Sequence, residues 1–188
     1  MKIYMFGGSF DPPHLAHIEI VNRLIADCDR FYIFPAKQSP YKVNKAICTP
    51  EQRFQMCRLS FLPISPKVEV SDYELNSRTP SYSINTVRWV YNQFPQCELS
   101  IIIGEDQGAK LNTWHEFEAL QELVTFICFS RNHSGLNPEI QLSYIENFNY
   151  EISSTELRNV LCRDLKKAKS MLHPHVFGYI QDNKLYSC

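Results

Sequence analysis

The segment GGSFDPPHLAH, residues 7–17, carries residue types that can hold a phosphate group and assist a reaction at phosphorus. Gly7 and Gly8 let the backbone approach a ligand closely, because they carry no side chain. His14 and His17 lie three positions apart, so a helix would place both imidazoles on one face. Imidazoles in that position can donate hydrogen bonds to a pentacovalent phosphate and offset its developing charge. The segment therefore predicts phosphate chemistry.

Each part of this segment also has a simpler interpretation. Two glycines after a strand are a weak signal, and an H-x-x-H pair is more often incidental than a metal site. Asp11 could simply be a loop-capping residue, because Asp-Pro often begins a turn. Zinc would need further ligands, and the other histidines, at 115, 133, 173 and 175, are not in ligand spacing. We predict no protein-held metal, and the order of the features favours the functional interpretation.

A parallel β-α-β unit is predicted to position this segment. Lys2–Phe6 is a short apolar run that ends at the two glycines, which indicates a buried strand. Leu15–Cys28 has apolar residues at helical spacing, and Arg30–Phe34 is a second predicted strand, closed by Pro35. In open parallel sheets, ligands bind beyond the carboxyl ends of the strands, where this loop would lie.

The rest of the chain continues the alternation of strands and helices. Thr49 is a predicted helix cap, with proline at the first helical position and Gln52 three residues after the cap. Further strands are predicted over 68–70, 99–103 and 124–130, and further helices over 81–94, 114–123, 153–162 and 174–181. The pattern predicts one α/β domain over residues 1–188, with a Rossmann-like, mostly parallel sheet and helices on both faces.

Composition limits the partners and the compartment. The chain has 188 residues and a formal net charge of −1, so nothing global draws it to nucleic acid or to an anionic membrane, and we expect neither as a partner. Its seven cysteines contain no C-x-x-C pair, which argues against a disulfide framework and for a reducing compartment. The first residues are too short an apolar stretch for a secretory signal, and no run could span a bilayer. We predict a cytoplasmic protein.

GGSFDPPHLAH resembles the phosphate-binding signature of the nucleotidyltransferase superfamily with the H-x-G-H motif. Members of that superfamily transfer a nucleotidyl group directly, without a covalent enzyme intermediate. The resemblance implies that His14 and His17 are catalytic and steady the α-phosphate of ATP. It implies an ATP-binding loop made of Gly7, Gly8, Ser9 and Phe10. Ala16 stands where glycine is usual, and we expect its methyl group to crowd whatever packs over that turn.

Four later segments are similar to those of the nicotinate mononucleotide adenylyltransferases, so the resemblance spans residues 2–186. They are SRTPSYSINT (77–86), IIIGEDQGAKLNTWHEFEAL (101–120), ISSTELR (152–158) and MLHPHVFGYIQDNKLY (171–186). Ser83 stands where threonine is common in that family.

For ATP, the resemblance implies a phosphate site completed by the C-terminal helices, about residues 152–188. Arg158 would hold the pyrophosphate leaving group as a guanidinium fork, together with the helix start at Ser153, Ser154 and Thr155. Lys42 would reach the distal phosphates, although Tyr41 stands before it where histidine is usual. The simpler interpretation of Arg158 is a solvated helix charge, as we expect for the basic residues that follow it.

For the mononucleotide, the resemblance implies a site made of Tyr82, Ser83, Thr86, Gly104, Asp106, Trp114 and His115. Trp114 could stack on the pyridine ring or simply pack in the core, and Trp114-His115 is expected to open a helix. Asp106 could accept hydrogen bonds from ribose hydroxyls. The helix start at 81–83 offers N–H groups to a carboxylate, and residues 77–86 contain no Asp or Glu that would accept from an amide. A preference for the acid over the amide follows.

The implied reaction transfers AMP from ATP to nicotinate mononucleotide, releasing pyrophosphate. Mg²⁺ is expected through the phosphates of ATP, because no carboxylate cage is evident. Two alternatives remain open: another adenylyltransferase of the superfamily, such as phosphopantetheine adenylyltransferase, and a catalytically silent nucleotide-binding module. We expect a monomer or a small homo-oligomer.

Overall fold

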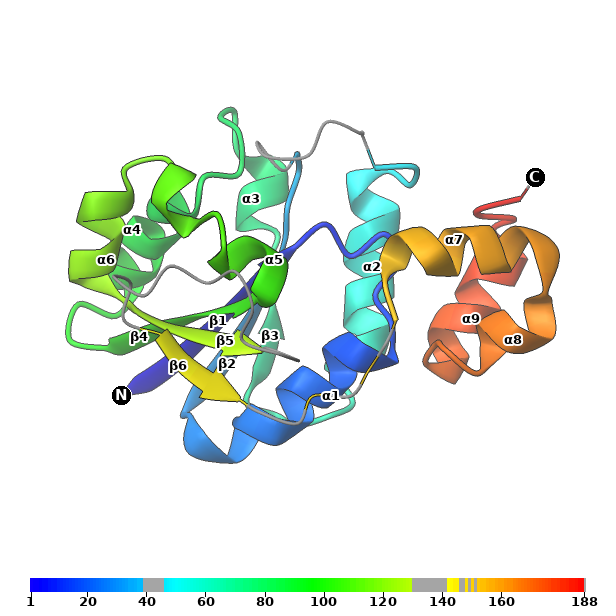
Figure 1. The fold of residues 1–188 in the computed structure, drawn as a ribbon, viewed down its shortest axis with the longest axis horizontal. Helices are drawn as coiled ribbons and strands as arrows, with labels where there is room; N and C mark the ends of the chain where they lie inside the picture. Colours follow the sequence, from blue (N-terminus) through cyan, green and yellow to red (C-terminus); the bar gives the residue numbers. More distant parts are fainter. Residues whose placement is uncertain (39–45, 130–141, 146–147, 149, 151, 188) are drawn as a thin grey trace.

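The computed structural model describes residues 1–38, 46–129, 142–145, 148, 150 and 152–187. Within them, the chain forms a six-stranded sheet in the order β3-β2-β1-β4-β5-β6 (Figure 1). The strands are β1 (Lys2–Gly8), β2 (Arg30–Pro35), β3 (Val68–Val70), β4 (Glu98–Gly104), β5 (Thr125–Phe129) and β6 (Leu142–Ile145). Every neighbouring pair is parallel, and the order reverses between β1 and β4. This confirms the predicted Rossmann-like sheet and puts its switch point at the end of β1.

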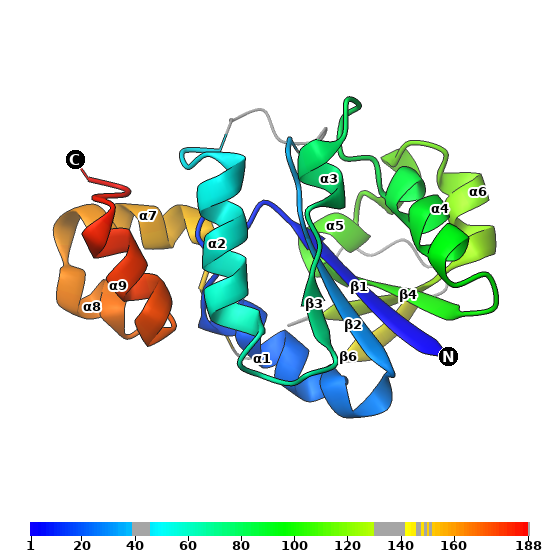
Figure 2. The same ribbon diagram turned by 180° about the vertical axis from the view of Figure 1, so that it is seen from behind.

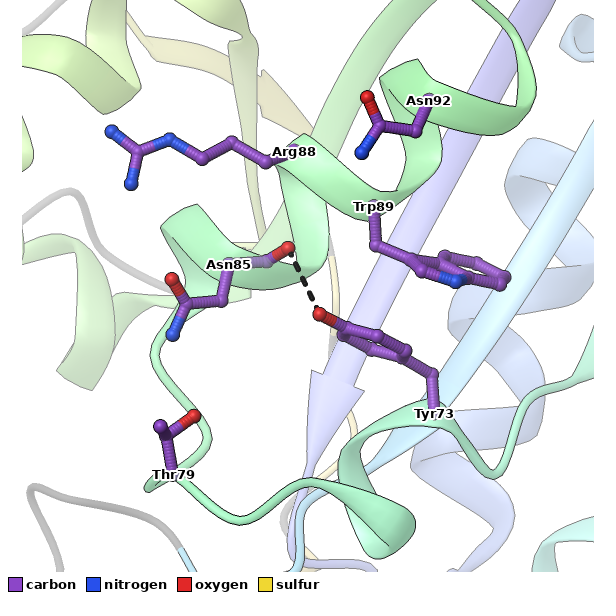
Figure 3. A pocket seen from close by; sticks show the side chains of 6 residues that line it. All are labelled: Tyr73, Thr79, Asn85, Arg88, Trp89 and Asn92. Atoms are coloured by element: carbon purple, nitrogen blue, oxygen red, sulfur yellow. Dashed lines mark hydrogen bonds between the residues drawn. The ribbon is translucent and has the colours of Figure 1, made fainter.

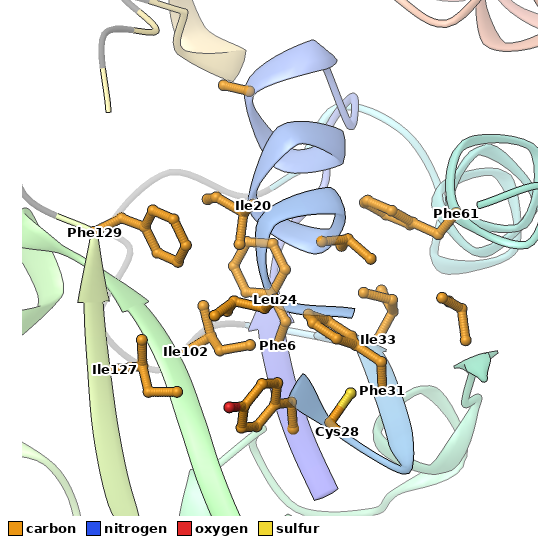
Figure 4. Close-up of a cluster of buried hydrophobic side chains, with 14 of the residues drawn as sticks. Phe6, Ile20, Leu24, Cys28, Phe31, Ile33, Phe61, Ile102, Ile127 and Phe129 are labelled. Carbon is orange, nitrogen blue, oxygen red and sulfur yellow. The ribbon is translucent and has the colours of Figure 1, made fainter. Parts of the chain in front are cut away.

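Helices cover both faces of the sheet, as the alternation of side chains along the central strands requires. Ile3 and Met5 face the cluster covered by α4 (Ser83–Gln93) and α6 (Phe117–Leu123). Tyr4 and Phe6 face the opposite cluster, which is covered by α1 (Leu15–Leu24) and α2 (Pro50–Phe61). Figure 4 shows this second cluster, where Phe61 of α2 and Ile20 of α1 lie over the strands. The strands are therefore buried on both sides.

The C-terminal helices form a third apolar cluster on the far side of α2. They are α7 (Ser154–Arg163), α8 (Leu165–Lys169) and α9 (Pro174–Asp182). Met56 of α2, Leu157 of α7 and Val176 of α9 are fully buried together in this cluster. Figures 1 and 2 show the three helices beside α2, away from the sheet. Helix α2 thus packs on the sheet with one side and on the C-terminal helices with the other.

Two helix starts follow from side-chain caps. Thr49 Oγ1 accepts a hydrogen bond from the Gln52 N–H (3.3 Å), and Gln52 Oε1 accepts from the Thr49 N–H (2.9 Å), which forms the predicted capping box of α2. Ser153 Oγ accepts from the Glu156 N–H (3.1 Å) and caps α7. These hydrogen bonds satisfy N–H groups that a helix cannot pair internally.

The structure corrects some predicted elements. The helix predicted from Trp114 begins at Phe117, because Glu116 has a φ of 53° and interrupts the helical backbone. Strand β6 and helix α8 were not predicted. Four shorter elements were also missed or merged: η1 (Ile25–Asp27), α3 (Tyr73–Asn76), α5 (Glu105–Gly108) and η2 (Leu111–Thr113).

One cysteine differs from the sequence-based prediction, which argued against a disulfide framework. Cys162 is disulfide-bonded, whereas the described cysteines at 28, 48, 57, 97 and 128 are free and buried. Of the helices that the structure describes, none has the length and apolar character to cross a membrane.

Candidate active site

The loop between β1 and α1 is shaped by two glycines with different surroundings. A Cβ atom added at Gly8 would lie 3.1 Å from Cζ of the Phe10 ring, whereas one added at Gly7 would meet nothing within 4 Å. Phe10 itself has a φ of 47°, in the left-handed region, and its ring is buried under the loop. Gly8 is therefore required by packing inside the protein, while Gly7 faces space that a ligand could occupy.

His14 and His17 meet as a stacked pair at the start of α1. Their ring centroids are 3.7 Å apart with an interplanar angle of 25°. His17 Nδ1 accepts a hydrogen bond from the His14 N–H (3.2 Å), so in a neutral His17 ring the proton is on Nε2, which is a donor. Phe10 lies edge-on against the His17 ring at 5.1 Å. The helix start thus holds the His17 ring in one orientation.

The His14 side chain is buried and electrically neutral. It is 4% exposed, and its Nδ1 has no hydrogen-bond partner among the described residues. Burial lowers the pKa of His14 to about 3, because the charged imidazolium would lose its hydration. His14 therefore brings a neutral imidazole with an unsatisfied ring nitrogen to the site.

The methyl group of Ala16 packs into the core of the protein. Ala16 is 4% exposed and belongs to the apolar cluster that contains Phe10 and Ile20. The methyl group that distinguishes alanine from glycine at this position is packed within that cluster. The expectation that this methyl group crowds whatever packs over the turn stays a prediction.

The start of α7 lies directly against the loop 7–17. Arg158 Nη1 donates to the Asp11 carbonyl oxygen (2.8 Å) and Nη2 to Thr155 Oγ1 (3.2 Å). Ser154 Oγ donates to the Pro12 carbonyl oxygen (2.9 Å). Arg158 is half-buried, with 24% of its side chain exposed, which differs from a freely solvated helix charge. The predicted phosphate loop and the ISSTELR helix therefore meet in space.

Asp11 connects this loop to two further segments, which sequence reasoning saw only as a possible loop cap. Its carboxylate accepts from the backbone N–H groups of Ile47 (2.8 Å) and Cys48 (3.2 Å), just before α2. The Tyr186 hydroxyl donates to Asp11 Oδ1 at 2.7 Å. Asp11 is 3% exposed, so the buried charge is compensated by these donors and by Arg158 Nη1, 3.9 Å from Oδ2.

A buried arginine that the sequence did not single out supports the same loop. Arg53 of α2 is 1% exposed, donates from Nη1 to the Ser9 carbonyl oxygen (2.7 Å) and from Nη2 to the Lys37 carbonyl oxygen (3.2 Å). Its Nε has no partner among the described residues. The guanidinium joins the exits of β1 and β2, and no sequence signal distinguishes it from an exposed helical arginine.

Two segments predicted to bind the mononucleotide lie side by side. The Tyr82 and His115 rings stack with centroids 4.3 Å apart and an interplanar angle of 30°. Trp114 is half-buried and packs with Tyr82 against the cluster under α4. Arg88 of α4 forms an ion pair with Glu116. The start of α4 and the residues before α6 therefore form one surface.

Thr86 lies beneath this surface. It is 1% exposed, and its hydroxyl donates to Glu74 Oε1 at 2.8 Å. Burial raises the pKa of Glu74. Glu74 is thus an acidic group beside the segment 77–86 that spacing along the chain did not reveal.

The remaining predicted residues lie at the same edge of the sheet or outside the described residues. Ser83 is the first residue of α4, Gly104 ends β4, and Asp106 is exposed on α5. Lys37, at the exit of β2, donates from Nζ to the Ser77 carbonyl oxygen (2.8 Å) and ties the 77–86 segment to the sheet. Lys42 lies outside the described residues.

A shallow cavity of about 330 Å³ lies elsewhere, on the outer side of α4 (Figure 3). Tyr73 and Trp89 stack there at 4.9 Å, and the Tyr73 hydroxyl donates to the Asn85 carbonyl oxygen (3.4 Å). Its lining contains none of the predicted site residues. We therefore place the candidate site at the carboxyl edge of the sheet.

Comparisons with known proteins identify relatives of this chain. Residues 5–160 match the model of the cytidylyltransferase-like family. A protein of Opitutus terrae named "Probable nicotinate-nucleotide adenylyltransferase" is 36% identical over 193 residues, which cover 99% of this chain and 98% of that protein. A protein of the same name from Nitratiruptor sp. is 36% identical over 160 residues, which cover 84% and 88%.

Among solved structures, the fold matches nicotinic acid mononucleotide adenylyltransferase of Plasmodium falciparum complexed with NaAD. The TM-score is 0.76 at 23% identity, over 98% of this chain and 97% of that one. This match supports the fold, while the relatives at 36% identity carry the family assignment. The chain belongs to the cytidylyltransferase-like family and, within it, to the nicotinate-nucleotide adenylyltransferases.

Proposed function

We propose that this protein transfers the AMP group of ATP to nicotinate mononucleotide, giving nicotinate adenine dinucleotide and pyrophosphate. The observation that carries the proposal is the meeting of three features at the switch point of the sheet. The glycine loop ends β1, the stacked His14 and His17 begin α1, and Arg158 of α7 lies against the same loop. The names of the relatives supply the substrate class.

The chemistry needs no nucleophilic side chain. A phosphate oxygen of the mononucleotide attacks the α-phosphorus of ATP and forms the new P–O bond, and the bond to the β-phosphate oxygen breaks as pyrophosphate leaves in line. Such a reaction depends on positioning and on stabilising charge at the equatorial oxygens. His17, held by its contact to the His14 N–H, donates from Nε2 to the α-phosphate, and His14 supports it as a neutral imidazole.

Arg158 and the start of α7 stabilise the departing pyrophosphate. The Asp11 carbonyl holds one arm of the guanidinium close to the loop 7–17, and the helix start adds N–H groups and a positive dipole end. Ser153, Ser154 and Thr155 lie at that start, and Lys42 is assigned to the distal phosphates. In this way the C-terminal helices complete the phosphate site.

Mg²⁺ enters as part of the substrate, MgATP. The described residues contain no group of three His, Cys, Asp or Glu side chains arranged to hold a metal. Asp11 already accepts three hydrogen bonds, so its carboxylate is occupied by protein donors. Phosphate oxygens and water are the ligands that suit Mg²⁺ here, and the ion offsets phosphate charge.

The mononucleotide is placed on the surface formed by Tyr82, Ser83, Trp114 and His115, with its ribose near Gly104 and Asp106. Backbone N–H groups at the start of α4 face a carboxylate better than an amide, whose NH₂ would be left without an acceptor. The buried Thr86 lies beneath this surface and stabilises it, because its hydroxyl donates a hydrogen bond to Glu74. We therefore propose a preference for nicotinate over nicotinamide mononucleotide.

A substrate panel tests the proposal. Pyrophosphate release is followed with MgATP and, separately, nicotinate mononucleotide, nicotinamide mononucleotide and phosphopantetheine. The highest kcat/KM is expected for nicotinate mononucleotide. A higher value for phosphopantetheine would assign a different transferase reaction, and no turnover with any acceptor would indicate a silent nucleotide-binding module.

A further inference from the structure

We propose that Tyr186 is a positioning residue for nucleotidyl transfer, which acts through the carboxylate of Asp11 on the loop that carries His14 and contacts Arg158. The inference rests on the proposed function. It adds a residue beyond the predicted site, 175 positions from the aspartate that it contacts.

The hydrogen bond between Tyr186 and Asp11 is short and buried from solvent. The hydroxyl donates to Asp11 Oδ1 at 2.7 Å, and the two residues are 7% and 3% exposed. Burial and the neighbouring Asp11 charge raise the pKa of Tyr186, so the phenol stays protonated and remains a donor. Water cannot replace this hydrogen bond without entering a buried space.

The backbone at Asp11 connects its hydrogen-bonded side chain to the residues proposed to contact the phosphates. Its carbonyl oxygen accepts from Arg158 Nη1 at 2.8 Å, and the next carbonyl, that of Pro12, accepts from Ser154 Oγ at 2.9 Å. Only His14 and the preceding proline separate these carbonyls from α1. A shift of the Asp11 side chain would therefore move both the guanidinium and the start of the histidine helix.

The ring and the hydroxyl of Tyr186 have separable roles. The ring belongs to the apolar cluster of α2 and α7–α9, which a phenylalanine would preserve. The residue also has a φ of 57°, a backbone conformation that non-glycine residues keep only when surrounding contacts determine it. The hydroxyl, in contrast, contacts the Asp11 carboxylate and the Cys48 thiol beside it. Removing the oxygen alone therefore tests positioning.

The test compares Tyr186→Phe with the wild type and with Tyr179→Phe. Tyr179 is a half-buried tyrosine of the same helical cluster, so its variant controls for loss of a phenol from these helices. We expect Tyr186→Phe to lower kcat about tenfold and to leave the KM for nicotinate mononucleotide unchanged, since loss of a hydrogen bond to a charged group is worth about tenfold or more. Tyr179→Phe should keep the wild-type kcat.

Rates are measured well below the unfolding midpoint of each variant, so that loss of folded protein does not enter. A wild-type kcat in folded Tyr186→Phe would overturn the inference and leave the proposed function intact. A wild type without turnover on nicotinate mononucleotide would overturn the proposed function itself, and the inference with it.

A double-mutant cycle with Arg158→Lys keeps the test decisive if Tyr186→Phe is also less stable. If Tyr186 acts through the turn that holds Arg158, the fold-loss in kcat from Tyr186→Phe should be several times smaller in the Arg158→Lys background. Equal fold-losses in both backgrounds would show that the two residues act independently and would overturn the inference.

Discussion

The proposed function gives the stacked histidines His14 and His17 different chemical roles. His17 has its Nδ1 engaged by the His14 N–H, while the His14 ring is buried and neutral. The pair therefore offers one oriented donor and one buried imidazole behind it, rather than two equivalent cations. Each role predicts a distinct experimental signature.

Replacing His17 should slow the chemical step. His17→Ala is expected to lower kcat by roughly 10²–10³-fold, the usual effect of removing one transition-state donor, while substrate affinity changes little. His175→Ala, at an exposed position of α9, is the matched control and should have wild-type kinetics. Steady-state pyrophosphate release measures both, and a full-rate His17→Ala enzyme would contradict the assigned role.

The buried His14 should make stability depend on pH. Its pKa is lowered from 6.5 to about 3 in the folded state, so below pH 6.5 the unfolded chain binds a proton that the folded one does not. The part of the free energy of unfolding that depends on a neutral His14 is fully present above pH 6.5. It is lost as the pH falls towards 3, by at most about 1.4 kcal/mol per pH unit. Urea unfolding at pH 7 and pH 5 measures the loss.

A His14→Gln variant provides the control for that prediction. Glutamine does not titrate, so the decrease in unfolding free energy between pH 7 and pH 5 should be smaller in the variant. An identical decrease in both proteins would assign the titration to other groups.

Local sequence predicted some of these residues and could not predict others. The histidines follow from their spacing in one segment, because residues three positions apart share one face of a helix. Tyr186 and Arg53 carry no such signal, since their partners lie 175 and 44 positions away. A buried arginine and an exposed one look alike until the fold brings carbonyl oxygens to the guanidinium.

At the scale of elements, boundaries were predictable where side chains enforce them. Thr49 and Gln52 cap α2 reciprocally, and the glycines end β1, so both were found. The start of α6 was misplaced because the left-handed backbone of Glu116 is set by tertiary contacts, including its ion pair with Arg88. Strand β6 exists by pairing with β5, which composition alone does not reveal.

For the two glycines between β1 and α1, we expect alanine substitutions to have different effects on stability. Gly8→Ala should lower the free energy of unfolding by about 1–3 kcal/mol, because the new methyl group would press on the buried Phe10 ring. Gly7→Ala should change it by less than about 0.5 kcal/mol, because its methyl group meets open space.

In substrate binding, we expect the larger effect from Gly7→Ala rather than from Gly8→Ala. If ATP occupies the space beside Gly7, Gly7→Ala raises the KM for ATP while its stability stays near wild type. Urea unfolding and ATP titrations on both variants measure the two effects. A stable Gly7→Ala enzyme with unchanged KM would place ATP elsewhere in the loop.

At the scale of the whole molecule, the candidate site lies where two apolar units that share α2 meet. The sheet provides the loop 7–17, and the helices α7–α9 provide Arg158. The alternation of strands and helices made the sheet predictable, whereas the docking of the helical unit depends on apolar side chains that the pattern does not pair. The resemblance, rather than periodicity, is the basis for the prediction that residues 152–188 complete the phosphate site.

Arg158→Ala should separate the two substrates. Loss of a charge-assisted contact is expected to cost about 1.5–3 kcal/mol, which appears as a higher KM for ATP and weaker pyrophosphate binding. The KM for nicotinate mononucleotide should stay near wild type, because the surface proposed for the mononucleotide lies at α4 and before α6. Arg163→Ala, at the far end of α7, is the control. A rise confined to the mononucleotide KM would reassign Arg158.

The hydrogen bond between Asp11 and Tyr186 also sets an order of events during protein synthesis. Asp11 leaves the ribosome 175 residues before its partner, so the sheet can form while the aspartate still lacks its last donor. We expect a nascent chain that ends before residue 186 to be folded around the sheet yet slow in catalysis. Full activity would then appear only when the final helix and Tyr186 have emerged from the exit tunnel.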